Sequence, residues 1–301
     1  MKKLLVSLAL VALMASTAAA QIVAIPRTTP GDSPAYNGPI YLFSLQNTKP
    51  LKPLAQIPET YLNDPSYSTF NKKGELFVGN RHGNVQGGVG SVSRFIVDNK
   101  GNFTFNGTIT GNGLDAVHGV AISPKGELFA ASHFTGTISR FVFDKTGMAI
   151  PNGTFETYGY PQAMAFSPEG ELFIADSSYN IVRRYLLNPV TGAAIPNGEV
   201  AVIGGDGLHG LTFSAKGEMF VGSIYNDTVF RYLFDSKGTP VANSSFPASG
   251  GPIGLAFSQS GELFVTGHLG GGISRFTFDK AGNSVLKEYT PTDYLGGIAI
   301  Y

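Results

Sequence analysis

The chain has 301 residues, and its 21 basic side chains equal its 21 acidic ones. A net charge of zero argues against nucleic acid as the main partner, which requires a basic surface, and gives no electrostatic reason to bind membranes. There is no cysteine, so a disulfide framework is excluded and a hydrophobic core alone must hold the fold. The 39 glycines, 22 phenylalanines and low charge of 14% favour many strands joined by tight turns.

The first twenty residues are predicted to be a secretory signal peptide. Lys2 and Lys3 precede an apolar run over residues 4–15, and alanines at 18–20 offer a cleavage site. The run is too short to span a bilayer, and no later segment is apolar enough to do so. We therefore expect an exported protein, periplasmic or secreted, with no membrane insertion. Residues 1–20 are the signal peptide, 21–37 an N-terminal segment and 38–301 one domain.

The two ends of the mature chain are predicted to complete one structural unit together. Residues 38–58 have the pattern of two strands, and residues 295–301 that of a first strand with nothing after it. Residues 21–26 are predicted to supply the missing second strand, and residues 27–37 a surface segment. Pairing of the N-terminal strands with the C-terminal strand would close a ring and hide the sheet edges.

Between these ends, the sequence Gly-Glu-(Leu/Met)-Phe occurs five times. It begins at Gly74, Gly126, Gly170, Gly217 and Gly261, with spacings of 44 to 52 residues. Each copy lies between two apolar strands and is followed by a third strand and a weaker fourth. A period in this range with four strands per unit predicts a propeller blade. The fold class is therefore all-β: a six-bladed β-propeller with four-stranded antiparallel blades, its ring closed by the chain ends.

The five histidines fall at two places in the repeated unit. Counted from the glycine of each repeat, position −8 begins the innermost strand and holds His118 and His209 in blades two and four. The other three follow the second strand at position +7 or +8: His82, His133 and His268. Both places open on the same face of a propeller, so we expect the histidines to crowd one end of the channel.

Position −11 carries aspartate in three blades: Asp115, Asp206 and Asp293. These carboxylates could orient the imidazoles or bind ligand, or they could cap turns. His118 and His209 are the candidate acid/base groups or metal ligands, because a neutral imidazole serves both roles. Alternatively, they are hydrogen-bonding residues that plug the channel. The remaining blades offer no strong third ligand at position −8, where they carry Ser66, Gln162, Ile253 and Gly296.

Other features recur in five blades or break the repeat. A glutamate opens each second strand and an arginine lies within each third strand, which favours a scaffold role because a single active site breaks ring symmetry. Residues 80–90 form a glycine-rich insertion after the second strand of blade one, predicted to be a lid or ligand loop. No Gly-x-Ser-x-Gly elbow or His-Glu-x-x-His motif marks a nucleophile or zinc site.

The repeat HGLTFSAKGEMFVGSIYNDTVFRYLFDSKGTPVANSSF (residues 209–246) resembles that of the gluconolactonase/regucalcin-like and NHL-repeat six-bladed propellers. In those families a strand similar to NGLAFSPDG precedes strands similar to LYVADS and RIYRFDLDADG. The resemblance covers residues 38–301. It implies a divalent metal held at position −8, but the oxygen ligands of the gluconolactonase-like proteins are replaced here by His118 and His209. The closer chemical analogy is therefore with NHL-type lyases, in which histidines hold zinc.

Two functions remain open at this stage. The first is a small-ligand site at a histidine-lined channel mouth, with a divalent ion such as Zn²⁺, Mn²⁺ or Ca²⁺ and lactone or ester hydrolase or lyase activity. Imidazole favours zinc and other transition metals over calcium. The alternative is a non-catalytic module that binds a peptide, glycan or partner protein. In either case we expect a monomer.

Overall fold

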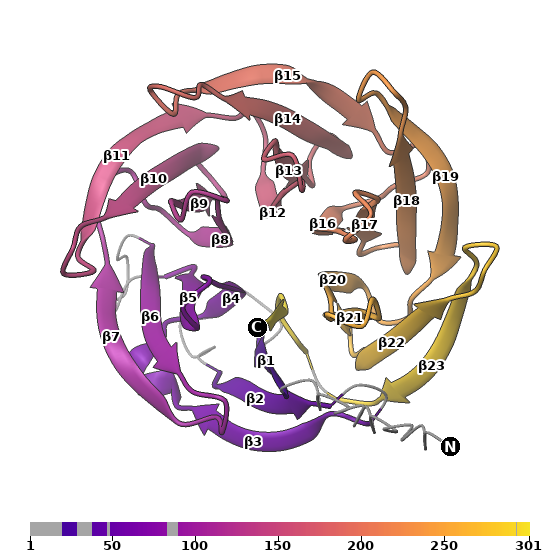
Figure 1. Ribbon diagram of the computed structural model, residues 1–301, viewed down its shortest axis with the longest axis horizontal. Helices are drawn as coiled ribbons and strands as arrows, with labels where there is room; N and C mark the ends of the chain where they lie inside the picture. Colours follow the sequence, from indigo (N-terminus) through magenta and orange to yellow (C-terminus); the bar gives the residue numbers. More distant parts are fainter. Residues whose placement is uncertain (1–19, 29–37, 47–48, 83–89, 293) are drawn as a thin grey trace, which may run out of the picture.

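The computed structural model describes residues 20–28, 38–46, 49–82, 90–292 and 294–301. Six four-stranded antiparallel sheets surround a central axis, as Figure 1 shows. This confirms the predicted six-bladed propeller. The predicted signal peptide up to residue 19, most of the 27–37 segment, residues 83–89 of the insertion and Asp293 lie outside the described residues. No helix in the described ranges is long and apolar enough to span a membrane.

The strands of blades one to three follow one another in chain order from the centre outward. Blade one contains Pro65–Phe70 (β4), Glu75–Asn80 (β5), Ser91–Val97 (β6) and Phe103–Ile109 (β7). Blade two contains Val117–Ile122 (β8), Leu128–Ser132 (β9), Thr137–Phe143 (β10) and Ala149–Glu156 (β11). Blade three contains Pro161–Phe166 (β12), Leu172–Asp176 (β13), Ile181–Leu187 (β14) and Ala194–Ala201 (β15).

Blades four and five repeat this order, and blade six joins the two ends of the chain. Blade four contains Leu208–Phe213 (β16), Met219–Ser223 (β17), Thr228–Phe234 (β18) and Pro240–Pro247 (β19). Blade five contains Pro252–Phe257 (β20), Leu263–Gly267 (β21), Ile273–Phe278 (β22) and Ser284–Thr290 (β23). Blade six contains Ala299–Ile300 (β24), Gln21–Pro26 (β1), Ile40–Leu45 (β2) and Lys52–Ile57 (β3). A short 3₁₀ helix, Glu59–Tyr61 (η1), follows β3 and leads into blade one.

The ring closure matches the prediction strand by strand. Within blade six, β24 pairs with β1 antiparallel, and Ala24 lies opposite Ala299. The backbone N–H of Ile22 also donates to the carbonyl of Tyr301 at 3.0 Å, and the N–H of Tyr301 donates back to Ile22 at 2.9 Å. The innermost and second strands of the last sheet therefore come from opposite ends of the sequence.

The recurring arginines and glutamates form five ion pairs, each within one blade. The pairs are Arg94–Glu75, Arg140–Glu127, Arg184–Glu171, Arg231–Glu218 and Arg275–Glu262. In blade four, Nη1 of Arg231 also donates to the carbonyl of Gly282, in a turn of blade five, at 2.7 Å. Arg184 makes the same bond to Gly238 of blade four at 3.0 Å. These contacts support the predicted scaffold role, and we call an arginine that is bound both to its glutamate and to a carbonyl of the next blade, as Arg184 and Arg231 are, a blade latch.

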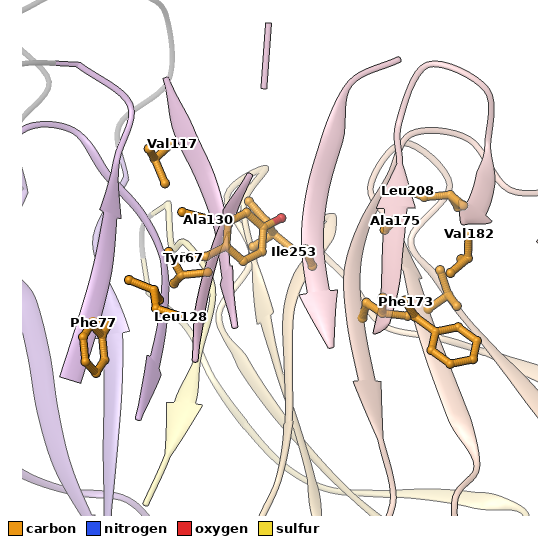
Figure 2. Packing of buried hydrophobic residues seen from close by; sticks show 14 of the residues in the cluster. Tyr67, Phe77, Val117, Leu128, Ala130, Phe173, Ala175, Val182, Leu208 and Ile253 are labelled. Carbon is orange, nitrogen blue, oxygen red and sulfur yellow. The ribbon is translucent and has the colours of Figure 1, made fainter. Parts of the chain in front are cut away.

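Tyr67 crosses the channel at the level of the inner strands. Its hydroxyl donates to the carbonyl of His209, in the opposite blade, at 3.2 Å. Its ring packs in a buried cluster that includes Ile253, and Figure 2 shows it between the inner strands. A cavity of about 280 Å³ lies beyond it, lined by inner-strand residues of all six blades from Tyr67 to Phe70 and their equivalents. Ile253 lines this cavity, whereas His118, Gln162 and His209, which also stand at position −8, do not.

Candidate functional site

A backbone irregularity presents the position −8 side chains. In five blades the ladder between the first and second strands breaks at this point, for example between Val117 and Val120 in blade two and between Leu208 and Leu211 in blade four. A β-bulge leaves residues out of the ladder and re-aims their side chains. His118 and His209 both lie in such bulges, so their side chains depart from the regular in-and-out alternation of the strand.

His118 belongs to a hydrogen-bonded chain that links blades two and three. Its Nδ1 lies 2.7 Å from Oε1 of Gln162, and Nε2 of Gln162 lies 3.2 Å from Nδ1 of His133. The two imidazole rings stack with centroids 4.2 Å apart and an interplanar angle of 15°. An amide oxygen only accepts, so Nδ1 of His118 carries the proton and its Nε2 is the basic nitrogen. For His133 the order is reversed, because the amide nitrogen donates to its Nδ1 and the ring proton is on Nε2.

His209 and His268 extend the group to blades four and five. Nδ1 of His209 lies 3.1 Å from the carbonyl of Gly207, which fixes this nitrogen as the donor and leaves Nε2 basic. Nδ1 of His268 lies 3.0 Å from the hydroxyl of Thr28 and 3.3 Å from the carbonyl of Leu295, so blade six holds this ring. Each of the two imidazoles is thus oriented by backbone or hydroxyl groups.

Blade one contributes a cation, Arg81, to the same region. Its Nε lies 2.7 Å from Oδ2 of Asp64, and its Nη2 donates to Oδ1 at 2.7 Å. Asp64 is 3% exposed, has a positive φ of 54° and also lies 3.0 Å from Nδ1 of His82. The hydrogen bond from Nη2 and the close contact of Nε hold the guanidinium against the Asp64 carboxylate. A pocket of about 510 Å³ is lined by Arg81, His82, Ala116, His118, His133 and Phe134.

Burial and mutual repulsion keep the inner imidazoles neutral. Burial, followed by the nearby charges of His133 and Arg81, holds the pKa of His118 well below 6.5. Burial lowers the pKa of His209 to about 4, and it also lowers the pKa of His268. The charge of Arg81 also lowers the pKa of all three. At neutral pH these rings are hydrogen-bonding bases rather than cations.

The structure brings some of the sequence-predicted site residues into contact and leaves others apart. His118 and His133 come into contact, whereas Asp115 and Asp206 lie at the start of the inner strands with their backbone N–H groups bonded to Ser132 and Ser223. The Nδ1 partners of His118 and His209 are the amide of Gln162 and a backbone carbonyl, so these aspartates do not occupy that place.

The sequence analysis did not identify Arg81 or Asp64 as site residues. Keeping positions +7 and +8 of the repeat separate would have identified the arginine. Position +7 bonds through its backbone N–H to position −10, as His133 does to Ala116 at 3.1 Å and Arg81 does to Asp64 at 3.1 Å. His82 is at position +8 and bonds to Asn63 instead. When positions +7 and +8 are treated as equivalent, His82 is assigned to the place in the repeat that Arg81 occupies.

The donor set does not fit a resident divalent metal. Among the described residues, no three His, Asp or Glu side chains are placed to hold an ion together. Arg81 adds a positive charge beside His118 and His209, and its charge repels a cation. Asp64, the carboxylate beside Arg81, is already bound by Arg81 and His82. The arrangement instead suits a ligand oxygen that carries or develops negative charge.

The free energy of unfolding is expected to fall as the pH is lowered from 7 to 4. The pKa of His209 is about 4 in the folded chain against 6.5 ordinarily, so the unfolded chain binds the proton first as the pH falls. By pH 4 this difference removes about 3 kcal/mol, and His118 adds a loss in the same direction. Urea unfolding at both pH values measures the effect. A His209→Gln variant should lose less stability over this range, and an unchanged loss would contradict the assignment.

Comparison with known proteins gives a family and several structural neighbours. A family model described as lactonase, seven-bladed β-propeller, matches residues 28–296. The family description names seven blades, whereas six sheets close the ring here. A search of curated proteins gave no match.

The structural neighbours confirm the predicted resemblance at the level of the fold. A putative 6-phosphogluconolactonase from Bacteroides fragilis is 18% identical, with a TM-score of 0.72 over 95% of this chain and 99% of the other. The periplasmic gluconolactonase of Pseudomonas aeruginosa is 20% identical, with a TM-score of 0.66 over 90% and 83%. A catalytically inactive virginiamycin B lyase from Staphylococcus aureus, with quinupristin, is 14% identical, with a TM-score of 0.55 over 89% and 84%.

Proposed function

The chain belongs to the lactonase family of β-propellers, and from this premise we propose that it hydrolyses a lactone in the pocket that Arg81, His118 and His133 line. The observation that carries the proposal is the presence of a cation and an oriented basic imidazole in one pocket. The structural neighbours include a gluconolactonase and a putative 6-phosphogluconolactonase, which supports a sugar lactone as the substrate class.

Hydrolysis needs a base for water and positive charge for the oxygen that becomes an oxyanion. The Nε2 of His118 accepts the proton of the attacking water, because its Nδ1 proton is held by Gln162. Arg81 stabilises the negative charge that develops on the carbonyl oxygen, with Asp64 fixing the guanidinium in place. The new bond joins the water oxygen to the carbonyl carbon.

Ring opening requires a proton on the leaving oxygen. The proton that Nε2 of His118 takes from the attacking water passes to the ring oxygen as its bond to the carbonyl carbon breaks, and the imidazole returns to its neutral form. His133, whose Nδ1 accepts from the amide of Gln162, helps to hold that amide in place. The amide of Gln162 bonds to both imidazoles and therefore couples their tautomers. His209 and His268, from blades four and five, are not among the residues that line this pocket, and in the proposal they bind substrate hydroxyl groups that extend beyond it, as neutral acceptors.

The proposed reaction uses no metal, because the arginine supplies the charge that a Lewis acid would otherwise supply. The expectation of Zn²⁺, Mn²⁺ or Ca²⁺ held by His118 and His209 is the alternative, and the addition of metal tests it. The proposal retains export through the signal peptide, which would place the reaction in the periplasm or outside the cell.

The direct test is lactone hydrolysis by the mature protein after dialysis against a chelator. We expect a rate above the spontaneous one for an aldonolactone, and a His118→Ala variant about 100-fold slower in kcat/KM. Ser66→Ala, the same strand position in blade one, is the matched control and should retain the wild-type rate. A wild-type rate equal to buffer over a panel of lactones and esters would overturn the proposal and favour the non-catalytic binding module. Activity that returns only with added metal would overturn the metal-free mechanism.

A further inference from the structure

A second groove adjoins the pocket, between blades two and three. Its volume is about 550 Å³, and it is lined by Phe134, Thr135, Glu156, Thr157, Tyr158, Gly159, Tyr160, Ser178 and Tyr179. Phe134 lines both the groove and the pocket. The ring of His133, already stacked on His118, lies 4.9 Å from the ring of Tyr160 and 4.8 Å from that of Phe134. The groove is therefore continuous with the proposed reaction site.

The groove presents aromatic rings to solvent. Tyr158 is 80% exposed, Phe134 66%, Tyr179 62% and Tyr160 47%. Four large rings around one groove make a concentrated apolar surface, which usually marks a binding site rather than a free surface. Tyrosine suits this role because it offers a rigid, amphipathic face at a low cost in conformational entropy.

A buried carboxylate holds the groove in shape. Asp176 is 1% exposed, and its Oδ1 accepts from the N–H and hydroxyl of Ser178 at 2.9 and 2.7 Å and from the N–H of Tyr179 at 3.2 Å. Its Oδ2 binds Arg183, whose guanidinium lies over the ring of Tyr179 at 5.6 Å from the centroid. Gly159 packs so closely that an added Cβ would lie 2.1 Å from Asp176.

This carboxylate–arginine pair occurs in blade three alone among the five internal repeats. The residues equivalent to Asp176 are Asn80, Ser132, Ser223 and Gly267, and those equivalent to Arg183 are Ser93, Ser139, Phe230 and Ser274. Residues that recur in all blades are expected to stabilise the propeller, whereas residues found in one blade only are expected to form a functional site. The pair fixes the loops that carry Tyr160 and Tyr179 and does not form a blade latch.

We propose that this groove binds a sugar ring linked to the lactone, so that the substrate is the aldonolactone of a disaccharide or longer oligosaccharide. The inference rests on the proposed lactonase function. A pyranose presents an apolar C–H face for stacking on an aromatic ring and hydroxyl groups at its rim. Glu156, Thr135 and Ser178 supply the hydrogen-bonding groups around the rings. An aryl substituent would favour an enclosed apolar slot, and these rings are open and lined by polar groups.

Calorimetric binding of aldonic acids tests the groove independently of catalysis. Gluconate is compared with cellobionate, maltobionate and lactobionate, and the corresponding lactones are compared by kcat/KM. We expect at least one disaccharide acid to bind about tenfold more tightly than gluconate, since each stacked ring adds a few-fold in affinity. Tyr179→Ala and Asp176→Asn should each reduce this preference toward unity. Tyr289→Ala, an exposed tyrosine of β23 on the outer edge of blade five, is the matched control and should retain it.

The outcomes separate this inference from the proposed function. A lactonase with no preference for any disaccharide form, in binding or in kcat/KM, overturns the sugar subsite and leaves the proposed function intact. Tight disaccharide binding that Tyr179→Ala abolishes, without lactone hydrolysis, supports the groove and overturns the enzyme. A preference that survives both Tyr179→Ala and Asp176→Asn in folded proteins would place the sugar elsewhere and contradict the inference.

Discussion

Replacing Arg81 by methionine is expected to lower kcat/KM for an aldonolactone by about 100- to 1,000-fold, the effect of removing an oxyanion-stabilising group. Arg81 is the positive charge that lines the pocket with His118, and its two bonds to Asp64 fix its orientation before substrate arrives. Methionine keeps much of the side-chain length and loses the charge. The loss should be in kcat more than in KM, because the charge is needed most when the carbonyl oxygen becomes negative.

The experiment must separate this role from an effect on folding, since Asp64 is left buried without its main partner. A double Arg81→Met/Asp64→Asn variant removes the stranded carboxylate and should recover stability without recovering activity. Arg81→Lys keeps the charge but loses the two-point contact with Asp64, so it should retain an intermediate rate. Thermal melting and kcat/KM measured on the same samples decide the question. A folded Arg81→Met protein with the wild-type rate would exclude Arg81 from the reaction.

Replacing Arg231 by methionine is expected to destabilise the fold by about 2–3 kcal/mol, because the change leaves the partly buried Glu218 without its partner. Arg231 forms the blade latch with Glu218 at 2.6 Å and with the carbonyl of Gly282 in the next blade at 2.7 Å. Its guanidinium also lies over the rings of Phe220 and Phe278, at 5.7 and 5.5 Å from the centroids. The substitution therefore removes an ion pair, a bond between blades and a cation–π contact together.

Urea unfolding of Arg231→Met and of an Arg231→Met/Glu218→Leu double variant measures this effect. The double variant should regain part of the lost stability, since no buried charge remains unpaired. Lys237→Ala, in an exposed turn of the same blade, is the control and should change stability by less than about 0.5 kcal/mol. A loss as small as that of the control in Arg231→Met would show that the latches add little to the ring.

Much of the fold could be predicted from the sequence, because five copies of one pattern identify the strands more securely than a single copy would. The five copies of Gly-Glu-(Leu/Met)-Phe set the strand register, and the unpaired strand patterns at both ends predicted the composition of the sixth blade. The recurring Glu and Arg positions were correctly assigned to the scaffold, although their bonds to the next blade depend on how the blades pack.

The site could be predicted only in part, because the spacing of residues within one repeat does not show which side chains of different blades come into contact. The pairing of His118 with His133 through Gln162 joins residues of two blades, and the bond from Tyr67 to His209 joins opposite blades. Asp64 adopts a backbone conformation that no pattern indicates. Blade three showed its difference in sequence through Asp176 and Arg183, but only the three-dimensional arrangement connects that pair with the exposed tyrosines.

The bond from Tyr67 to the opposite blade also determines how solutes move. With the ring of Tyr67 across the axis, we expect passage of solutes through the propeller from one face to the other to be obstructed. For the proposed lactonase, the lactone and the opened acid would then enter and leave on the same face. The acid would therefore compete with fresh lactone for the pocket.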